Sequence, residues 1–169
     1  MKQQNWFVAY TYPKAEKKVS NRILEAGFDS FLPLQKVRRV WSDRIKYIEE
    51  PLFSSYVFVK TDVTNLPRLT DIHGLSRFIA FQGEYAKVKE KEIKMIQKFV
   101  TSGVDIDVFS GRLREKQLVR VKSGPFAGME GLLVRKEGKG RFVVEIKGIS
   151  QSISVNIPAQ CLEVITNKA

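Results

Sequence analysis

The last third of the chain alternates short β-prone runs with glycine-containing turns, and this pattern restricts that region to a small all-β fold. The runs cover residues 117–121, 129–135, 141–146, 151–157 and 162–165. Glycines interrupt them at 123–125, 137–140 and 147–148. Short strands spaced this closely predict a small five-stranded β-barrel over residues 114–169.

The first hundred residues mix strand and helix patterns. Residues 5–12 are aromatic and β-branched, which predicts a strand, and the apolar spacing after Pro13 predicts a helix that Gly27 ends. Further strands are expected at 28–34, 51–59 and 75–81, and helices at 65–72 and 89–102. This order predicts an α+β sandwich, ferredoxin-like in outline, over residues 1–102. Residues 103–113 lack a clear period and are expected to be an interdomain linker.

A basic hairpin is predicted inside the first domain. Residues 36–41 face residues 44–48 across the two-residue turn Ser42-Asp43. Its cations are Lys36, Arg38, Arg39, Arg44 and Lys46. So small and basic a hairpin is either an arm that faces nucleic acid or a solubilised edge.

The strand at 51–59 is apolar on both faces. Tyr56 and Phe58 point to one face, and Val57 and Val59 to the other. Either helices cover both faces, or one face is left for a partner protein. Both readings remain open on the residues alone.

The charge predicts a polyanionic partner. Lys and Arg number 29 against 18 for Asp and Glu, so the net charge is +11. This excess favours nucleic acid ahead of a membrane surface. On the first predicted helix, Lys14, Lys18 and Arg22 recur at a spacing of four. They form either a solvated helix face or a row of cations along a phosphate backbone.

Several classes of protein are excluded. The single cysteine, Cys161, and the single histidine, His73, exclude a disulfide framework, Cys-rich zinc sites and His-x-x-x-His metal motifs. No phosphate-cradling glycine motif, signal peptide or run of about 18 apolar residues is present. We therefore expect a non-enzymatic cytoplasmic protein without catalytic residues, metal, cofactor or membrane contact.

The barrel opens with a loop rich in glycine at 119–131, which resembles the KOW motif of transcription elongation and ribosomal proteins. Gly124, Gly128 and Gly131 suit tight or positive-φ positions. Phe126 lies at the tip of this loop together with Pro125, and an exposed aromatic there is expected to anchor a protein partner. The alternative is that Phe126 folds back to plug one end of the barrel.

Three more segments extend the resemblance. Residues 6–10 with the basic helix after them, 50–59 and 74–81 resemble the N-terminal (NGN) domain of the NusG family, and with the KOW region they account for residues 5–166. The resemblance implies an NGN domain followed by an SH3-like KOW barrel. It also implies a monomeric transcription elongation and antitermination factor.

In that family the NGN domain binds the clamp helices of the RNA polymerase β′ subunit, approaches the β subunit and suppresses pausing and termination. The resemblance implies polymerase contacts at seven positions: Phe53, Tyr56, Phe58, Phe78, Phe81, Ile93 and Ile96. It implies contacts with non-template DNA at Lys14, Lys18, Arg22, His73 and Arg77, and with upstream DNA at the hairpin cations. The KOW loop would recruit the ribosomal protein NusE or the termination factor Rho.

Two further points follow from the resemblance. Most general NusG proteins have Pro-Gly where this chain has Ser54-Ser55, and the string at 50–59 is more similar to specialised paralogues of the RfaH and UpxY type. We therefore expect a regulator of specific operons, such as capsular polysaccharide loci, with a general factor as the alternative. The β-prone pattern at 117–165 favours a barrel rather than a switch of the KOW domain to a helical hairpin.

A ribosome-associated KOW protein that binds structured RNA is the competing class of function. The overall charge agrees with it, but it leaves residues 6–81 unexplained.

Overall fold

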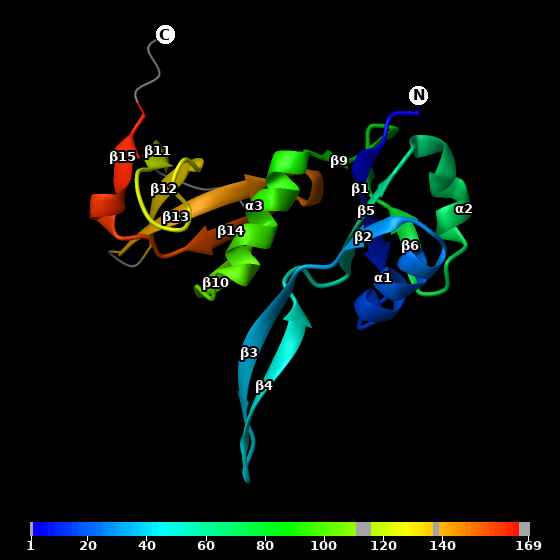
Figure 1. The fold of residues 1–169 in the computed structure, drawn as a ribbon, viewed down its shortest axis with the longest axis horizontal. Coiled ribbons are helices and arrows are strands. Elements are labelled where there is room, and N and C mark those ends of the chain that lie inside the picture. Colours follow the sequence, from blue (N-terminus) through cyan, green and yellow to red (C-terminus); the bar gives the residue numbers. More distant parts are fainter. Residues whose placement is uncertain (1, 111–115, 137–138, 166–169) are drawn as a thin grey trace. The chain divides into compact units, whose positions relative to one another are not determined.

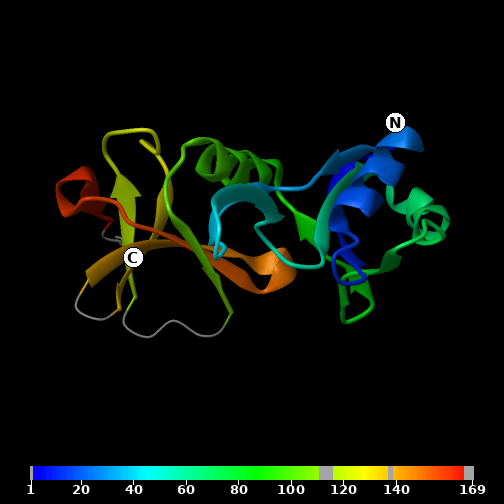
Figure 2. The ribbon, with the colours of Figure 1, turned by 90° about the horizontal axis from the view of Figure 1, so that it is seen from below.

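The structure is a computed structural model that describes residues 2–110, 116–136 and 139–165. The chain divides into two compact units, Met1–Ile96 and Gln97–Ala169, and each has its own antiparallel sheet (Figures 1 and 2). Residues 111–113 of the expected linker and 137–138 of an expected turn lie outside the described residues.

The first unit is an α+β sandwich, as the sequence predicts. Its sheet has the strand order β2-β5-β1-β6, and β9 also pairs with β1. The strands are β1 (Asn5–Thr11), β2 (Asp29–Phe31), β5 (Tyr56–Thr61), β6 (Leu75–Phe78) and β9 (Lys87–Val88). The helices are α1 (Glu16–Glu25) and α2 (Leu66–Thr70), the latter preceded by the short helix η1 (Val63–Asn65).

One face of this sheet forms a closed core. Phe7 and Ala9 of β1 lie opposite Val59 and Val57 of β5, and all four are fully buried. Apolar residues of the two helices complete the same cluster: Val19 and Ile23 of α1, and Leu66 and Leu69 of α2. This packing explains the apolar spacing of the first helix, because its apolar residues face the sheet.

The other face of the sheet meets the first turn of α3 (Glu90–Thr101). The carboxylate of Glu90 accepts hydrogen bonds from Trp6 Nε1 at 2.7 Å and from Lys60 Nζ at 3.2 Å. Because Trp6 and Lys60 are a cross-strand pair, they project from the same face. Helices therefore contact both faces of the sheet. On the face of Trp6 and Lys60, the contact with α3 is at the end of the sheet that carries these two residues.

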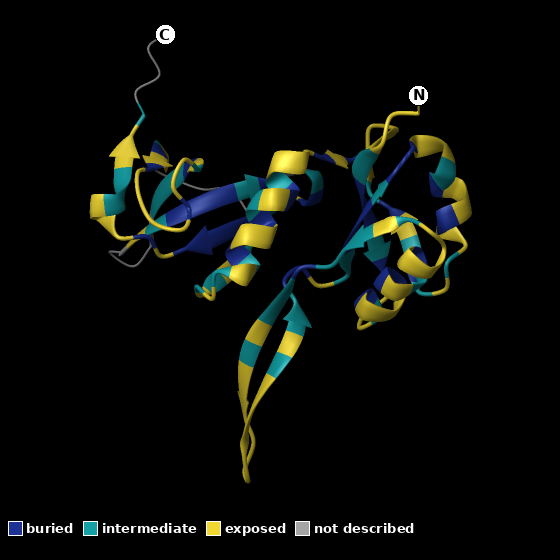
Figure 3. Cartoon of the chain, viewed as in Figure 1, coloured by how far each residue is buried: buried dark blue, intermediate teal, exposed yellow. Residues whose placement is uncertain are grey.

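The predicted basic hairpin is confirmed. Strands β3 (Leu34–Val40) and β4 (Ile45–Pro51) pair only with each other, and Trp41 N donates to Arg44 O across the Ser42-Asp43 turn. The hairpin extends beyond the sheet of the first unit, and its distal half is exposed (Figures 1 and 3).

A second, shorter hairpin interrupts the predicted strand at 75–81. It consists of β7 (Ala80–Phe81) and β8 (Glu84–Tyr85), and it packs on the sheet through an edge-on contact between Tyr85 and Phe7. The expected single strand is therefore two strands, because β6 pairs with β1 whereas β7 pairs with β8.

The second unit contains a six-stranded sheet with the order β10-β14-β13-β12-β11-β15. The strands are β10 (Ile106–Phe109), β11 (Lys116–Val121), β12 (Glu130–Lys136), β13 (Lys139–Ile146), β14 (Gln151–Val155) and β15 (Leu162–Val164). Two short helices, η2 (Lys147–Ile149) and η3 (Ala159–Cys161), lie between strands. All five predicted strands are present. The sixth, β10, comes from the expected linker, where Ile106 to Phe109 pair with Val155 to Ser152 of β14.

Candidate functional site

A row of three side chains crosses the sheet of the first unit at the end opposite Trp6. Tyr10 lies opposite Tyr56 of β5 on one side and Arg77 of β6 on the other. The two tyrosine rings meet edge to face at 5.7 Å, and the Arg77 guanidinium lies 4.8 Å from the centre of the Tyr10 ring. The tyrosines are half-buried and Arg77 is exposed. The row therefore offers aromatic surface, two hydroxyl groups and a cation to a partner.

An aromatic cluster continues from this row along the same face, but it is closed. The Phe58 ring stacks on Phe31 at 6.0 Å and meets Phe53 edge-on at 6.1 Å. Phe58 is fully buried and Phe53 is 2% exposed. Phe58 and Phe53 therefore support the face on which Tyr56 lies and offer no surface to a partner, whereas Phe31 at the edge of the cluster is half-buried.

The structure corrects the grouping of the seven expected polymerase-binding residues. Phe78 lies opposite Ala9 and belongs to the core against α1 and α2, so its register places it on the face opposite Tyr56. Ile93 and Ile96 are buried on α3. Of the seven, Tyr56 is half-exposed and Phe81 is 51% exposed. Sequence patterns identified apolar residues here, but they did not separate packed rings from accessible ones.

The turn before Tyr56 is held by Glu16, a residue that the sequence patterns did not single out. Ser55 has φ = 66°, a left-handed conformation that glycine adopts more readily. Its backbone N–H donates to Glu16 Oε1 at 2.8 Å, and Ser55 O accepts from Thr11 N at 2.8 Å. Glu16 is only 6% exposed. The available signal was an acidic residue at the start of the helix, directly before two lysines.

The three cations expected on the first helix divide into two kinds, and Lys14 lies before α1 rather than on it, with φ = 62°. Lys14 and Lys18 are exposed, whereas Arg22 is half-buried and donates through Nη1 to the backbone oxygen of His73 at 2.6 Å. This bond places the exposed His73 next to α1, so two of the expected DNA-binding residues, Arg22 and His73, are neighbours. Arg77 is separate from them, since it lies over Tyr10 on the other face of the sheet.

Gly74, next to His73, shows how closely this loop approaches α1. It has φ = 98°, and a Cβ there would lie 2.9 Å from Val19 Cγ2. The loop at 73–74 is therefore fixed against the helix that carries the lysines.

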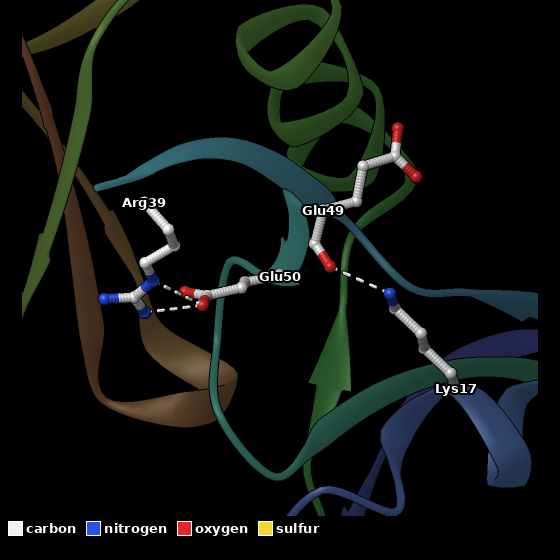
Figure 4. A network of polar contacts seen from close by, with 4 residues as sticks. All are labelled: Lys17, Arg39, Glu49 and Glu50. Atoms are coloured by element: carbon white, nitrogen blue, oxygen red, sulfur yellow. Dashed lines mark hydrogen bonds and ion pairs between the residues drawn. The ribbon is translucent and has the colours of Figure 1, made fainter. Parts of the chain in front are cut away.

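The hairpin cations lie on two faces. Alternation places Arg38 with Tyr47, and Arg39 with Lys46. Arg39 is bonded to Glu50 through Nε at 3.2 Å and Nη2 at 2.5 Å, and Lys17 Nζ of α1 donates to Glu49 O at 2.8 Å (Figure 4). The Lys17 bond ties the base of the hairpin to α1, and the Arg39 bond links the two strands of the hairpin. The cations near the tip are exposed.

The sequence analysis treated the hairpin as basic and overlooked its apolar residues. Its large hydrophobic side chains near the tip are strongly exposed: Val40 at 66%, Trp41 at 48%, Ile45 at 53% and Tyr47 at 66%. Large apolar side chains in a hairpin with no core of its own were the available signal.

The KOW loop differs from expectation at its aromatic residue. Phe126 is 4% exposed and packs against Phe99 of α3, with ring centroids 4.8 Å apart in the second unit. The ring therefore folds inward, which is closer to the alternative considered from the sequence. Gly124 and Gly128 have φ values of 88° and 87°, and Pro125 between them is exposed. The physical reason is that Phe99 offers apolar surface, which the loop sequence alone does not show.

Charged groups on the first unit are held by defined partners. The Trp6 and Lys60 donors hold the pKa of the Glu90 carboxyl below its ordinary value. The hydroxyl and backbone N–H of Thr64 likewise lower the pKa of Asp62. Within the described ranges there is no group of three or more His, Cys, Asp and Glu side chains placed to hold a metal ion. The helices in those same ranges are too short or too polar to cross a membrane.

Comparisons with known proteins agree on one family. A family model described as "Transcription termination factor nusG" matches residues 4–97. The NusG transcription termination/antitermination protein of Streptococcus pyogenes serotype M3 is 32% identical in an alignment of 154 positions, and the match covers 79% of this chain and 82% of that protein. The corresponding protein of Lactococcus lactis is 30% identical, with 80% of each chain covered.

A solved structure supports the fold independently. The structure titled "Domain interaction in Thermotoga maritima NusG" matches 97% of this chain and 98% of its own, with a TM-score of 0.57 and 18% identity. The family model spans more than half of the chain, and the curated relatives extend the match into the second unit. The chain therefore belongs to the NusG family of transcription termination and antitermination proteins.

Proposed function

We propose that this NusG-family protein binds RNA polymerase through the half-exposed row of Tyr10, Tyr56 and Arg77, with the β′ clamp helices as the partner and the β subunit as a further contact. The observation that carries the proposal is the edge-to-face contact of the two tyrosines, at the end of the sheet where they stay half-exposed. Rigid aromatic residues with polar tips make strong interface anchors because little entropy is lost on binding.

The proposed mechanism is differential binding and involves no chemical step. A factor that binds the elongating state of polymerase more tightly than the paused state shifts the population toward elongation. The bond from Ser55 to Glu16 supports this role because it fixes the backbone beside Tyr56 before the partner arrives. The protein would act as a non-enzymatic monomer in the bacterial cytoplasm.

The test is co-purification with core polymerase after nuclease digestion. Tyr56→Ala should weaken binding by about tenfold, the effect of losing a central aromatic anchor. Tyr12→Ala is the control, since Tyr12 is 60% exposed and lies outside the row. Normal binding by a folded Tyr56→Ala protein would overturn the proposal. Phe58→Ala is a poor probe because Phe58 is fully buried.

We also propose that Lys14, Lys18, Arg22 and His73 contact the non-template strand, and that the hairpin contacts upstream DNA. The exposed lysines and the bond from Arg22 to His73 support a continuous basic surface. Reversing Lys14 and Lys18 to Glu should weaken recruitment and reduce its dependence on salt. The double variant Lys91→Glu/Lys98→Glu on α3 is the control of equal charge change, since both lysines are exposed. An unchanged salt dependence in the double variant would contradict the contact.

The third proposed contact is between the KOW loop and a second protein, NusE or Rho. Since Phe126 is buried, the accessible part of the loop is Pro125 with its flanking glycines. Pull-down with each purified candidate, using Pro125→Asp as the disrupting variant, would identify the partner. Binding that is indifferent to this variant would exclude the loop.

We infer a specialised role at particular operons, such as capsular polysaccharide loci, from the Ser54-Ser55 string. A general elongation role is the second candidate, favoured because the curated relatives carry the name transcription termination/antitermination protein NusG. In vitro transcription past one terminator on several templates separates the two. Readthrough on every template would indicate the general factor. Readthrough only on templates that carry one particular promoter-proximal DNA element would indicate the specialised factor.

A further inference from the structure

The tip of the β3–β4 hairpin carries a stacked aromatic–cation pair that the proposed DNA contact does not explain. The Arg44 guanidinium lies 4.8 Å from the centre of the Trp41 ring, across the turn that joins the strands. Both residues are exposed, and Trp41 remains 48% accessible with Arg44 beside it. A tryptophan with so much free ring surface contributes little to the fold.

The register of the hairpin places further cations on the same face. Arg39 lies opposite Lys46, and the next residues on that face, by alternation, are Trp41 and Arg44. The opposite face of the tip has a different character, since Val40, Ile45 and Tyr47 lie there with Arg38. Near the tip, the Trp41 face therefore places Arg39, Arg44 and Lys46 beside one flat aromatic ring.

We propose that the Trp41 face binds unpaired DNA, with a base stacked on the Trp41–Arg44 pair and the neighbouring phosphates held by Arg44 and Lys46. An aromatic ring among cations is the arrangement that proteins use for single strands, because every base offers a flat face and every link a phosphate. In duplex DNA the bases are stacked on one another and are not free to stack on a protein side chain. Binding to a duplex would therefore use the cations as phosphate contacts and would not use the Trp41 ring.

The hairpin is built to present this face. The bond from Lys17 to Glu49 O holds the base of the hairpin, and the bond from Arg39 to Glu50 links its strands. Among the described strands, β3 and β4 pair with each other alone. Arg39 is partly neutralised by Glu50, which leaves Arg44 and Lys46 as the principal phosphate contacts. The stack of Arg44 on Trp41 orders both side chains before a nucleotide arrives, which lowers the entropic cost of binding.

This inference rests on the proposed function, which places the hairpin near DNA, and its test is independent of polymerase. Fluorescence anisotropy of the full chain measures binding to a labelled single strand of about 15 nucleotides, to the matching duplex and to RNA of the same sequence. Trp41→Ala should weaken binding to the single strand by about fivefold or more and leave duplex binding nearly unchanged. Trp41→Phe should recover part of the loss.

The matched control is Tyr47→Ala, because Tyr47 is equally aromatic, 66% exposed and on the opposite face of the same hairpin. Its affinity for the single strand should equal that of the unaltered chain. Equal losses in the two variants, no loss in Trp41→Ala, or the same loss on duplex as on single strand would each overturn the proposal. Tighter, Trp41-dependent binding to RNA would overturn the choice of DNA.

Polymerase co-purification of Trp41→Ala separates the two proposals. If Trp41→Ala still binds polymerase but has lost binding to the single strand, the result supports separate sites for polymerase and for unpaired DNA. Lost binding of Tyr56→Ala to polymerase has no bearing on the hairpin, and a failure of Trp41→Ala to affect the single strand leaves the polymerase contact standing.

Discussion

The carboxylate of Glu16 on α1 accepts the backbone N–H of Ser55, 39 residues away, at 2.8 Å. This single bond connects the start of the helix to the turn that precedes Tyr56. Since Ser55 has a left-handed backbone, the bond offsets the cost of a conformation that a residue with a side chain adopts reluctantly. The orientation of the tyrosine row therefore depends on a buried acidic residue in a basic helix.

Removing that acceptor should destabilise the first unit. Glu16→Ala leaves the Ser55 N–H without its partner, and we expect the free energy of unfolding to fall by about 1–3 kcal/mol. Glu16→Gln keeps an amide oxygen as acceptor and should recover most of the loss. Urea unfolding followed by circular dichroism measures both. Glu25→Ala, exposed at the end of the same helix, is the control and should change little.

The packing of Phe99 against Phe126 predicts energetic coupling between α3 and the KOW loop. Phe126→Ala should lower the stability of the second unit by about 2–4 kcal/mol, because a buried ring is lost. In a double-mutant cycle with Phe99→Ala, the two losses should fall short of additivity by about 0.5–1.5 kcal/mol.

The control for this cycle is Pro125→Ala, next to Phe126 and exposed. Thermal unfolding of the full chain provides the readout. Strictly additive losses would show that the two rings are buried independently, in contradiction to their observed contact.

Gly131 should not tolerate a side chain. A Cβ at this position would lie 2.6 Å from the Phe142 ring and 2.7 Å from the backbone oxygen of Val143. The backbone cannot move aside easily, so Gly131→Ala should cost about 1–3 kcal/mol of stability. At Gly140 the nearest atom is the end of the Leu133 side chain at 3.2 Å, and Gly140→Ala should cost less. Equal melting temperatures for the two variants would contradict this expectation.

Glu90 should make the first unit less stable in acid. Its pKa is lowered in the folded chain, first by the Trp6 N–H and then by Lys60. Its stabilising contribution is therefore complete above its ordinary pKa of 4.5 and is lost as the pH falls through the lower folded value.

The measurement for Glu90 is the urea midpoint at about pH 7 and over a series of decreasing pH values below about 4.5, along which the carboxylate gains its proton. Glu90→Gln should be less stable than the unaltered chain at the higher pH, and the difference should shrink as the pH falls. Glu25→Gln controls for the general effect of removing one exposed acid. A difference that stays constant with pH would mean that the charge of Glu90 is unimportant.

Much of the molecule follows from local patterns in the sequence. The alternating strand at Trp6–Tyr10, the apolar stripe at Val19 and Ile23 and the Ser42-Asp43 turn each reflect interactions among near neighbours. For that reason the α+β class of the first unit, the basic hairpin and the strands after residue 115 could be predicted. The motifs at 50–59 and 119–131 were sufficient to indicate the family.

The candidate site was harder to predict because accessibility depends on partners that are distant in sequence. Tyr56 and Phe58 have the same periodicity, yet one is half-exposed and the other is closed between Phe31 and Phe53. Phe126 likewise turns inward because Phe99 lies close to it.

The amino-acid order by itself determined which segments become strands and helices, the excess of positive charge and the family motifs, since these depend on side-chain chemistry and spacing along the chain. The tertiary structure alone decided that Phe78 lies opposite Ala9 rather than beside Tyr56, that Glu16 holds Ser55 and that Trp41 shares a face with Lys46. The physical reason is strand register: a shift of one residue moves every side chain to the other face, and only packing across the whole sheet selects among the alternatives.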